Sequence, residues 1–265
     1  MTFNDIQNEI LFRSRAHGIN WGGAPQNAAT DFLAPYALAA FINEGYNEFL
    51  SFTKDTPIAT LLLTTPSVAN ANNLALNPLP PTALGATNPS IMKVMRAYYT
   101  QAGSAMRRTR LISSIRFDFV TGGFVRRLGN YSSYPRFASQ FLGERTLEFY
   151  PGFGVANDTI SLWCIPDPQS SPAAVTAAQG GVLAAAADVP LIPPQFHGAL
   201  VEYVLMKVFD PVNRQAGYDR AEKRWQQYLE EAAFFGSTFT EGDPEQGVLD
   251  NYISDDELGL IFDIP

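Results

Sequence analysis

The alternation of hydrophobic and polar residues is clearest between Ile192 and Phe235, where it predicts two amphipathic helices joined by a short turn. In the first helix, apolar residues recur at i, i+4, i+7, i+8 and i+12, the spacing of one buried face: Phe196, Leu200, Tyr203, Val204 and Val208. Pro193 and Pro194 suit its first turn, where backbone N–H groups have no partner inside the helix. Asp219 is expected to cap the second helix, whose inner side would carry Ala221, Trp225, Tyr228, Leu229 and Ala232. Its outer side would carry Glu222, Lys223, Arg224, Glu230 and Glu231.

Helical spacing also marks the start of the chain. A short helix that ends by Gly18 is predicted from the apolar positions Phe3, Ile6, Ile10 and Leu11. A longer helix, capped by Thr30 or Asp31, is predicted from the apolar residues Phe32, Tyr36, Ala39, Ile42, Tyr46, Phe49 and Leu50.

The middle of the chain changes to a period of two, which is typical of strands. Residues 58–65 predict a first strand, and the Asn- and Pro-rich residues 66–90 predict a long surface excursion. Further strands are expected around Val94, Arg96 and Tyr98, and around Ile115, Phe117 and Phe119. Two more, over 146–150 and 159–165, would be ended by Pro151-Gly152 and by Pro166-Asp167-Pro168, with Ile160, Leu162 and Cys164 on one face.

This order of elements predicts an α+β fold, a helical bundle with an inserted antiparallel β module and an extended acidic C-terminal tail. Residues 1–57 would form the N-terminal helices of the bundle and residues 191–235 its C-terminal hairpin. Residues 58–190 would form the inserted β module with long loops and an Ala-rich linker, and residues 236–265 the tail.

Composition limits the class of protein. With 265 residues, 46% of them hydrophobic, the chain can bury a substantial core. Its single cysteine, Cys164, excludes an intrachain disulfide framework, and the polar N-terminus predicts a soluble, non-secreted protein. The net charge of -8 is unevenly spread: residues 93–145 hold ten basic and two acidic residues, whereas residues 236–265 hold eight acidic and no basic ones.

Few residues favour catalysis or a cofactor. His17 and His197 are expected to have capping, structural or interface roles, and Cys164 to be a buried, inert thiol. The sequence has no phosphate-binding glycine loop, and Asp255, Asp256 and Glu257 lack the pattern of a calcium loop. We therefore expect no enzyme activity, no metal and no cofactor.

The arginine-rich middle has three interpretations: a nucleic-acid surface, solvated strand faces or a protein interface. A nucleic-acid-associated module would use Arg107, Arg108, Arg110, Arg126 and Arg127, although a sequence pI near 4.8 counts against it. The interface hypothesis pairs Arg107, Arg108, Arg126 and Arg127 of one copy with the tail of its neighbour. The tail residues concerned are Asp255, Asp256, Glu257, Leu258, Leu260, Ile261 and Phe262.

Several of these segments carry a resemblance to a known family. The long helix before the strands, the strand LEFYPG, the strand ending in IPDP, the IPP entry into QFHGALVEYVL and the closing helix YDRAEKRWQQYLEEAAFF resemble head-to-tail adaptor (connector or neck) proteins of tailed bacteriophages. The resemblance covers roughly residues 30–235, without the acidic tail or the Asn/Pro-rich excursion.

The resemblance implies a structural virion protein, made in the host cytoplasm and placed in the neck between capsid and tail. It implies a homo-oligomeric ring, commonly twelve-fold, that joins the portal protein to tail or nozzle proteins. DNA would pass through the channel without specific binding, and no membrane would be involved.

Overall fold

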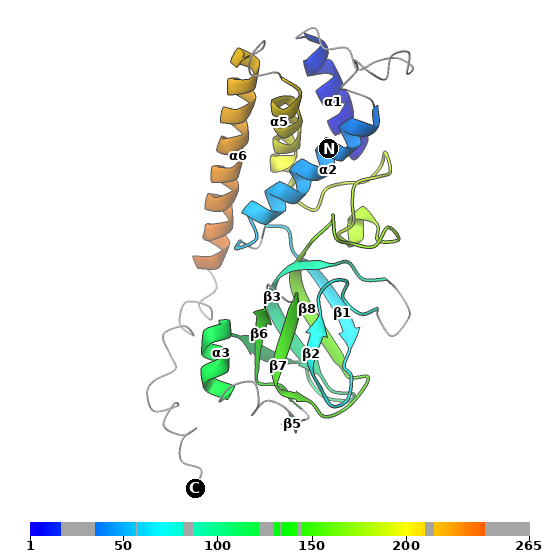
Figure 1. Cartoon of the computed structure of the whole chain (residues 1–265), viewed down its shortest axis with the longest axis vertical. Helices are drawn as coiled ribbons and strands as arrows, with labels where there is room; N and C mark the ends of the chain where they lie inside the picture. The colour runs from blue at the N-terminus through cyan, green and yellow to red at the C-terminus, as the bar shows by residue number, and fades with distance from the viewer. Residues whose placement is uncertain are drawn as a thin grey trace.

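The computed structural model of the chain describes residues 1–16, 35–56, 58–81, 87–121, 130–132, 134–141, 145–209 and 215–241. Figure 1 shows a layer of helices at one end of the molecule and a strongly curled sheet at the other. Each part has its own hydrophobic core. The chain enters the sheet after the second helix and returns to the helices after the last strand.

Within the described residues, the helical end consists of α1 (Phe3–Ala16), α2 (Pro35–Phe52), α5 (His197–Val208) and α6 (Gln215–Glu241). The central helix is α5, because α1, α2 and α6 all pack against it. The apolar face predicted for α5 is confirmed, since Phe196, Leu200, Tyr203, Val204 and Val208 are all buried. On α6, Ala221, Trp225, Leu229 and Ala232 are buried as predicted, and Tyr228 packs partly buried against the same core.

Local chemistry explains how these helices begin and how closely they pack. Thr2 and Asp5 exchange backbone-to-side-chain hydrogen bonds at the start of α1, in the manner of a capping box. The predicted cap at Asp219 is wrong, because α6 already begins at Gln215. Gly45 allows α2 to approach α5 closely, since a Cβ atom there would lie 2.6 Å from the ring of Tyr203.

The sheet has eight strands: β1 (Leu61–Pro66), β2 (Ala71–Ala75), β3 (Ile91–Thr100), β4 (Arg107–Leu111), β5 (Tyr131–Ser132), β6 (Phe137–Phe141), β7 (Thr146–Phe153) and β8 (Thr159–Pro166). Their order is β1-β8-β3-β4-β6-β7-β2, with β5 paired to β7. The β4–β6 and β5–β7 pairs are parallel, and the others are antiparallel. The predicted face of β8 is confirmed, because Ile160, Leu162 and Cys164 are fully buried.

The predicted fold class is wrong. The protein is a mixed α/β structure with a large, curled, eight-stranded sheet, and it is not a helical bundle that carries a small antiparallel β module. Two features that the sequence pattern did not reveal account for the difference. The Asn/Pro-rich excursion contributes β2 and buries Leu74, Leu76 and Leu79 in the core of the sheet. Parallel pairing also brings together strands that are separated along the chain.

Two local predictions in the β region are also corrected. The alternating residues 115–119 form helix α3 (Ser114–Thr121), in which Phe117 is buried while Ile115 and Phe119 are 84% and 64% exposed. Residues three or four apart share a helix face, so an alternating pattern leaves only one of these side chains facing the core. Strand β7 does not end at Pro151-Gly152 but continues to Phe153, whose ring stacks on Tyr99.

The Ala-rich segment that leads back to the helices is part of the core. It contains a single 3₁₀ turn, η1 (Ala177–Gln179), and it buries Ala177, Leu183 and Ile192 among the helices. The side-chain amide of Asn43 on α2 donates to the Leu183 carbonyl and accepts from the Leu183 N–H, at 2.9 and 2.7 Å. This pair of bonds fixes the segment against α2.

Candidate partner-binding site

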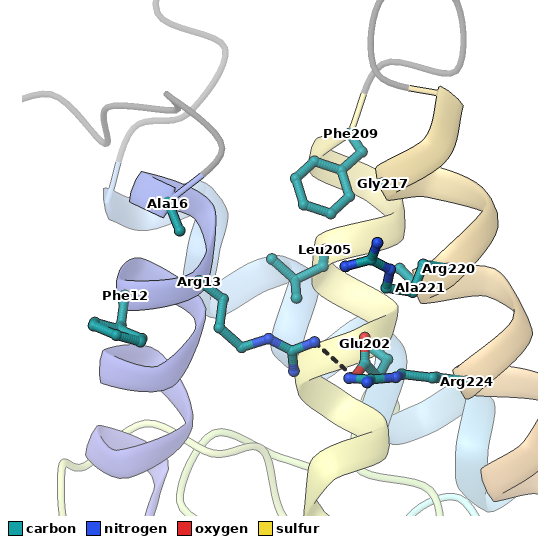
Figure 2. Close-up of a pocket in the computed structure, with 10 residues that line it drawn as sticks. All are labelled: Phe12, Arg13, Ala16, Glu202, Leu205, Phe209, Gly217, Arg220, Ala221 and Arg224. Atoms are coloured by element: carbon teal, nitrogen blue, oxygen red, sulfur yellow. Dashed lines mark hydrogen bonds and ion pairs between the residues drawn. The ribbon is translucent and has the colours of Figure 1, made fainter.

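A hollow of about 230 Å³ lies between α1, α5 and α6 (Figure 2). It is lined by the end of α1, the end of α5 and the start of α6, which lie away from the sheet in Figure 1. Its apolar wall includes Phe12 of α1 with Leu205 and Phe209 at the end of α5. Its charged side chains are Arg13, Glu202, Arg220 and Arg224.

Helical spacing brings these residues together. From α6, residues Gly217, Arg220, Ala221 and Arg224 are spaced at i, i+3, i+4 and i+7, and therefore share one face. Glu202 and Leu205 are three apart on α5, and Arg13 and Ala16 are three apart on α1. Gly217 leaves room for the ring of Phe209, because a Cβ atom there would lie 3.1 Å from it.

Glu202 is the centre of the charged group. Its side chain is only 3% exposed, and its Oε1 atom accepts hydrogen bonds from Arg13 at 2.9 Å and from Arg224 at 3.2 Å. Figure 2 shows the two guanidinium groups reaching this oxygen from α1 and α6. A buried carboxylate is tolerated only when it is paired in this way, so the ion pairs join the three helices.

The charges in the hollow do not balance. Three arginines face one carboxylate, which leaves a formal excess of two positive charges among the lining residues. The Oε2 atom of Glu202 is buried and accepts no hydrogen bond from the described residues. Arg220 is exposed and its side chain extends over the hollow, as Figure 2 shows. The site thus combines spare cationic donors with one spare buried acceptor.

The structure describes only part of the interface that the sequence predicts. Arg107 and Arg108 lie exposed on β4, where the Arg107 guanidinium is 3.8 Å from the centre of the Tyr134 ring. Arg126 and Arg127, like the tail residues 255–262, lie outside the described residues. No described contact joins the β4 arginines to the hollow, which belongs to the helical layer rather than to the sheet.

The residues considered for catalysis, His197 and Cys164, are buried within the fold. His197 is fully buried, and its Nε2 donates to the Ile192 carbonyl at 2.9 Å while Nδ1 lies 2.9 Å from the Met1 amino group. Burial, together with the positive charge of that amino group, lowers the pKa of His197. Burial likewise raises the pKa of the Cys164 thiol, and His17 lies outside the described residues. Among the described residues, no group of three or more His, Cys, Asp or Glu side chains is placed to hold a metal ion.

The hollow is the feature that the sequence analysis missed. Arg224 was assigned to the outer side of its helix, yet it bonds the buried Glu202. The available signal was Glu202 itself, a lone acid in the apolar run ALVEYVLM, because a charge on a buried helix face requires a partner. The partner could not be identified from the sequence, because Arg13 is 189 residues away from Glu202 along the chain.

The described residues form a charged hollow between packed helices. His197 and Cys164 are buried within the fold. These features suit a protein that contacts partners. No helix in the described part of the chain is both long and apolar enough to span a membrane. A search of curated proteins finds no match.

The model of the SU10 adaptor protein family matches residues 1–243, so the chain belongs to this family. The resemblance to bacteriophage head-to-tail adaptors is thereby confirmed. The chain has the structural role of a phage adaptor, belongs to the virion and associates with portal and tail components.

Proposed function

We propose that the protein forms a homo-oligomeric ring in the neck of the virion, where it joins the portal protein to tail or nozzle proteins. The observation that carries this proposal is the match to the adaptor family over residues 1–243. The described chemistry agrees with a structural role, because the buried Cys164 and His197 are engaged within the fold. The protein would act through assembly and not as an enzyme.

The proposed ring has twelve copies and surrounds part of the DNA channel. DNA would pass without specific binding, because the net charge of -8 of the chain as a whole opposes binding to the phosphate backbone. Contacts between copies would bring the acidic tail, including Asp255, Asp256, Glu257, Leu258, Leu260, Ile261 and Phe262, onto a basic surface of the next copy. Arg107, Arg108, Arg126 and Arg127 remain proposed partner contacts, of which Arg107 and Arg108 lie on β4 of the sheet.

The oligomeric state of the purified protein tests the proposal directly. The full-length protein is purified and examined by native mass spectrometry and particle imaging, alone and after mixing with a portal ring. We expect ring-shaped particles with a mass about twelve times 29.1 kDa, free or bound to the portal. A protein that stays monomeric in both conditions would contradict the ring.

Direct DNA binding is the alternative function. It is favoured by the exposed arginines Arg107, Arg108 and Arg110 on β4 and by the aromatic neighbour Tyr134. It predicts that the monomer is retained on immobilised DNA and released by salt, with an affinity that falls steeply as salt rises. Retention by the monomer, reduced by Arg108→Gln, would favour this alternative over the adaptor ring.

A further inference from the structure

The hollow around Glu202 has two unmet requirements that together define its ligand. The excess positive charge of its guanidinium groups favours binding of an anion. The buried Glu202 Oε2 lacks a hydrogen-bond donor. A simple carboxylate would satisfy only the first requirement. A peptide satisfies both, because an acidic side chain can pair with Arg220 and Arg224 while a backbone N–H donates to Glu202.

The size of the hollow and its apolar wall further limit the range of possible ligands. At about 230 Å³ the hollow is smaller than the ~300–1,000 Å³ of typical small-molecule pockets, and is suited to one or two side chains. Phe12 stands at its edge with 72% of its surface exposed, and Leu205 and Phe209 contribute apolar lining from α5. The hollow therefore suits a peptide in which acidic and apolar residues lie close together.

The chain itself contains such a segment. Residues 242–265 hold seven acidic residues and no basic residue. Within them, three consecutive acids at 255–257 are followed at once by Leu258, Leu260, Ile261 and Phe262. The charge and the order of these residues complement a hollow that has cationic side chains beside an apolar wall.

We propose that residues 255–262 of a second copy bind in the hollow between α1, α5 and α6, so that the tail links neighbouring subunits. This inference rests on the proposed ring. The tail leaves α6 at Glu241, about 30 Å along the helix from Arg220 at 1.5 Å per residue. The 14 residues from Glu241 to Asp255 reach at most about 50 Å when extended, which is enough to bridge to another copy.

The hollow is a better receiving surface than the arginines of the sheet. Arg107 and Arg108 are exposed to solvent, where ion pairs contribute little, and Arg107 already stacks on Tyr134. The hollow excludes part of the solvent and offers an apolar wall, so the same acidic segment gains both ionic and apolar contacts there.

Disulfide trapping between full-length copies tests the proposal. One copy carries Ala16→Cys at the edge of the hollow and the other carries Gly259→Cys in the tail, and the two are mixed and mildly oxidised. The native Cys164 is fully buried and does not compete. A matched control replaces the first copy by Ser104→Cys, an exposed position near the β4 arginines.

We expect a disulfide-linked dimer in about ten-fold higher yield from position 16 than from position 104, because docking raises the effective concentration of the tail thiol. Adding Arg220→Glu to the Ala16→Cys copy should lower that yield about ten-fold. Reversing the tail with Asp255→Lys and Asp256→Lys in the Gly259→Cys copy should restore it.

Three results would overturn the proposal: equal yields at positions 16 and 104, a yield unaffected by Arg220→Glu, or a disulfide that forms only within a chain carrying both cysteines. Native mass is measured on the same samples. Intact rings without the dimer band would contradict this docking site alone, whereas samples that form no rings either alone or after mixing with a portal ring would contradict the proposed assembly.

Discussion

Replacing Glu202 by glutamine removes the charge at the centre of the hollow while preserving the shape of the side chain. The carboxylate is 3% exposed and accepts two charge-assisted hydrogen bonds, from Arg13 and Arg224. Breaking a buried ion pair from one side costs about 3–5 kcal/mol, and one hydrogen bond to a charged group contributes about 1.5–3 kcal/mol. The two arginine side chains are 26% and 52% exposed and can recover water, so we expect a loss of about 2 kcal/mol in the free energy of unfolding.

The loss can be measured by urea unfolding, followed by fluorescence of the buried Trp225, at one protein concentration for all variants. For a chain of this size we expect the melting temperature to fall by about 4–8 °C. The matched control is Glu230→Gln at an exposed position of α6, which should change stability by less than about 0.5 kcal/mol. If both variants lose the same small amount, Glu202 does not hold α1 and α6 to α5, and the account of the hollow is wrong.

Three further predictions concern the two cores. Gly45→Ala should destabilise the protein by about 1–3 kcal/mol, seen as a lower melting temperature, because the new methyl group overlaps the ring of Tyr203; an unchanged melting temperature would contradict the close approach of α2 and α5. Tyr99→Phe removes the 2.6 Å hydrogen bond that the phenol donates to the buried Asp158, and should lower the free energy of unfolding by about 1–3 kcal/mol in urea titrations; a neutral effect would rule out that bond. Because the pKa of folded His197 lies below the unfolded value of about 6.5, its neutral form stabilises the fold above that pH, and the contribution is lost as pH falls. Wild-type stability should therefore decline below pH ~6.5 more steeply than that of His197→Gln, and parallel pH profiles would refute this assignment.

The helical end was largely predictable because burial there follows a single period. The faces of α5 and α6 have apolar residues three and four apart, and such a face must be covered. The sheet was harder because its strands are irregular. Irregularities in the β3–β8 pairing shift the register between Ile91 and Lys93 and between Val94 and Arg96, so the buried residues of β3 do not alternate strictly.

In the local sequence pattern, only Glu202, a lone acid in an apolar run, gave a signal of the hollow. Each helix by itself has an amphipathic surface. The ion pairs of the hollow form only where α1 and α6 pack against α5. The segment after β8 posed a similar difficulty, because its alanines carry little hydrophobic signal although Leu183 and Ile192 are buried. Long-range packing, rather than local propensity, decides such positions.

The pair of hydrogen bonds between the Asn43 side-chain amide and the backbone of Leu183 holds the returning chain against α2, much as a neighbouring strand would. One side chain thereby fixes the position of the segment that connects β8 to α5. In the proposed ring, every subunit would repeat this attachment, so a shift of the segment would recur in each copy. A leucine at position 43 would keep the bulk of the side chain but remove both hydrogen bonds, and the segment would then be held against the helices by its buried apolar residues Leu183 and Ile192.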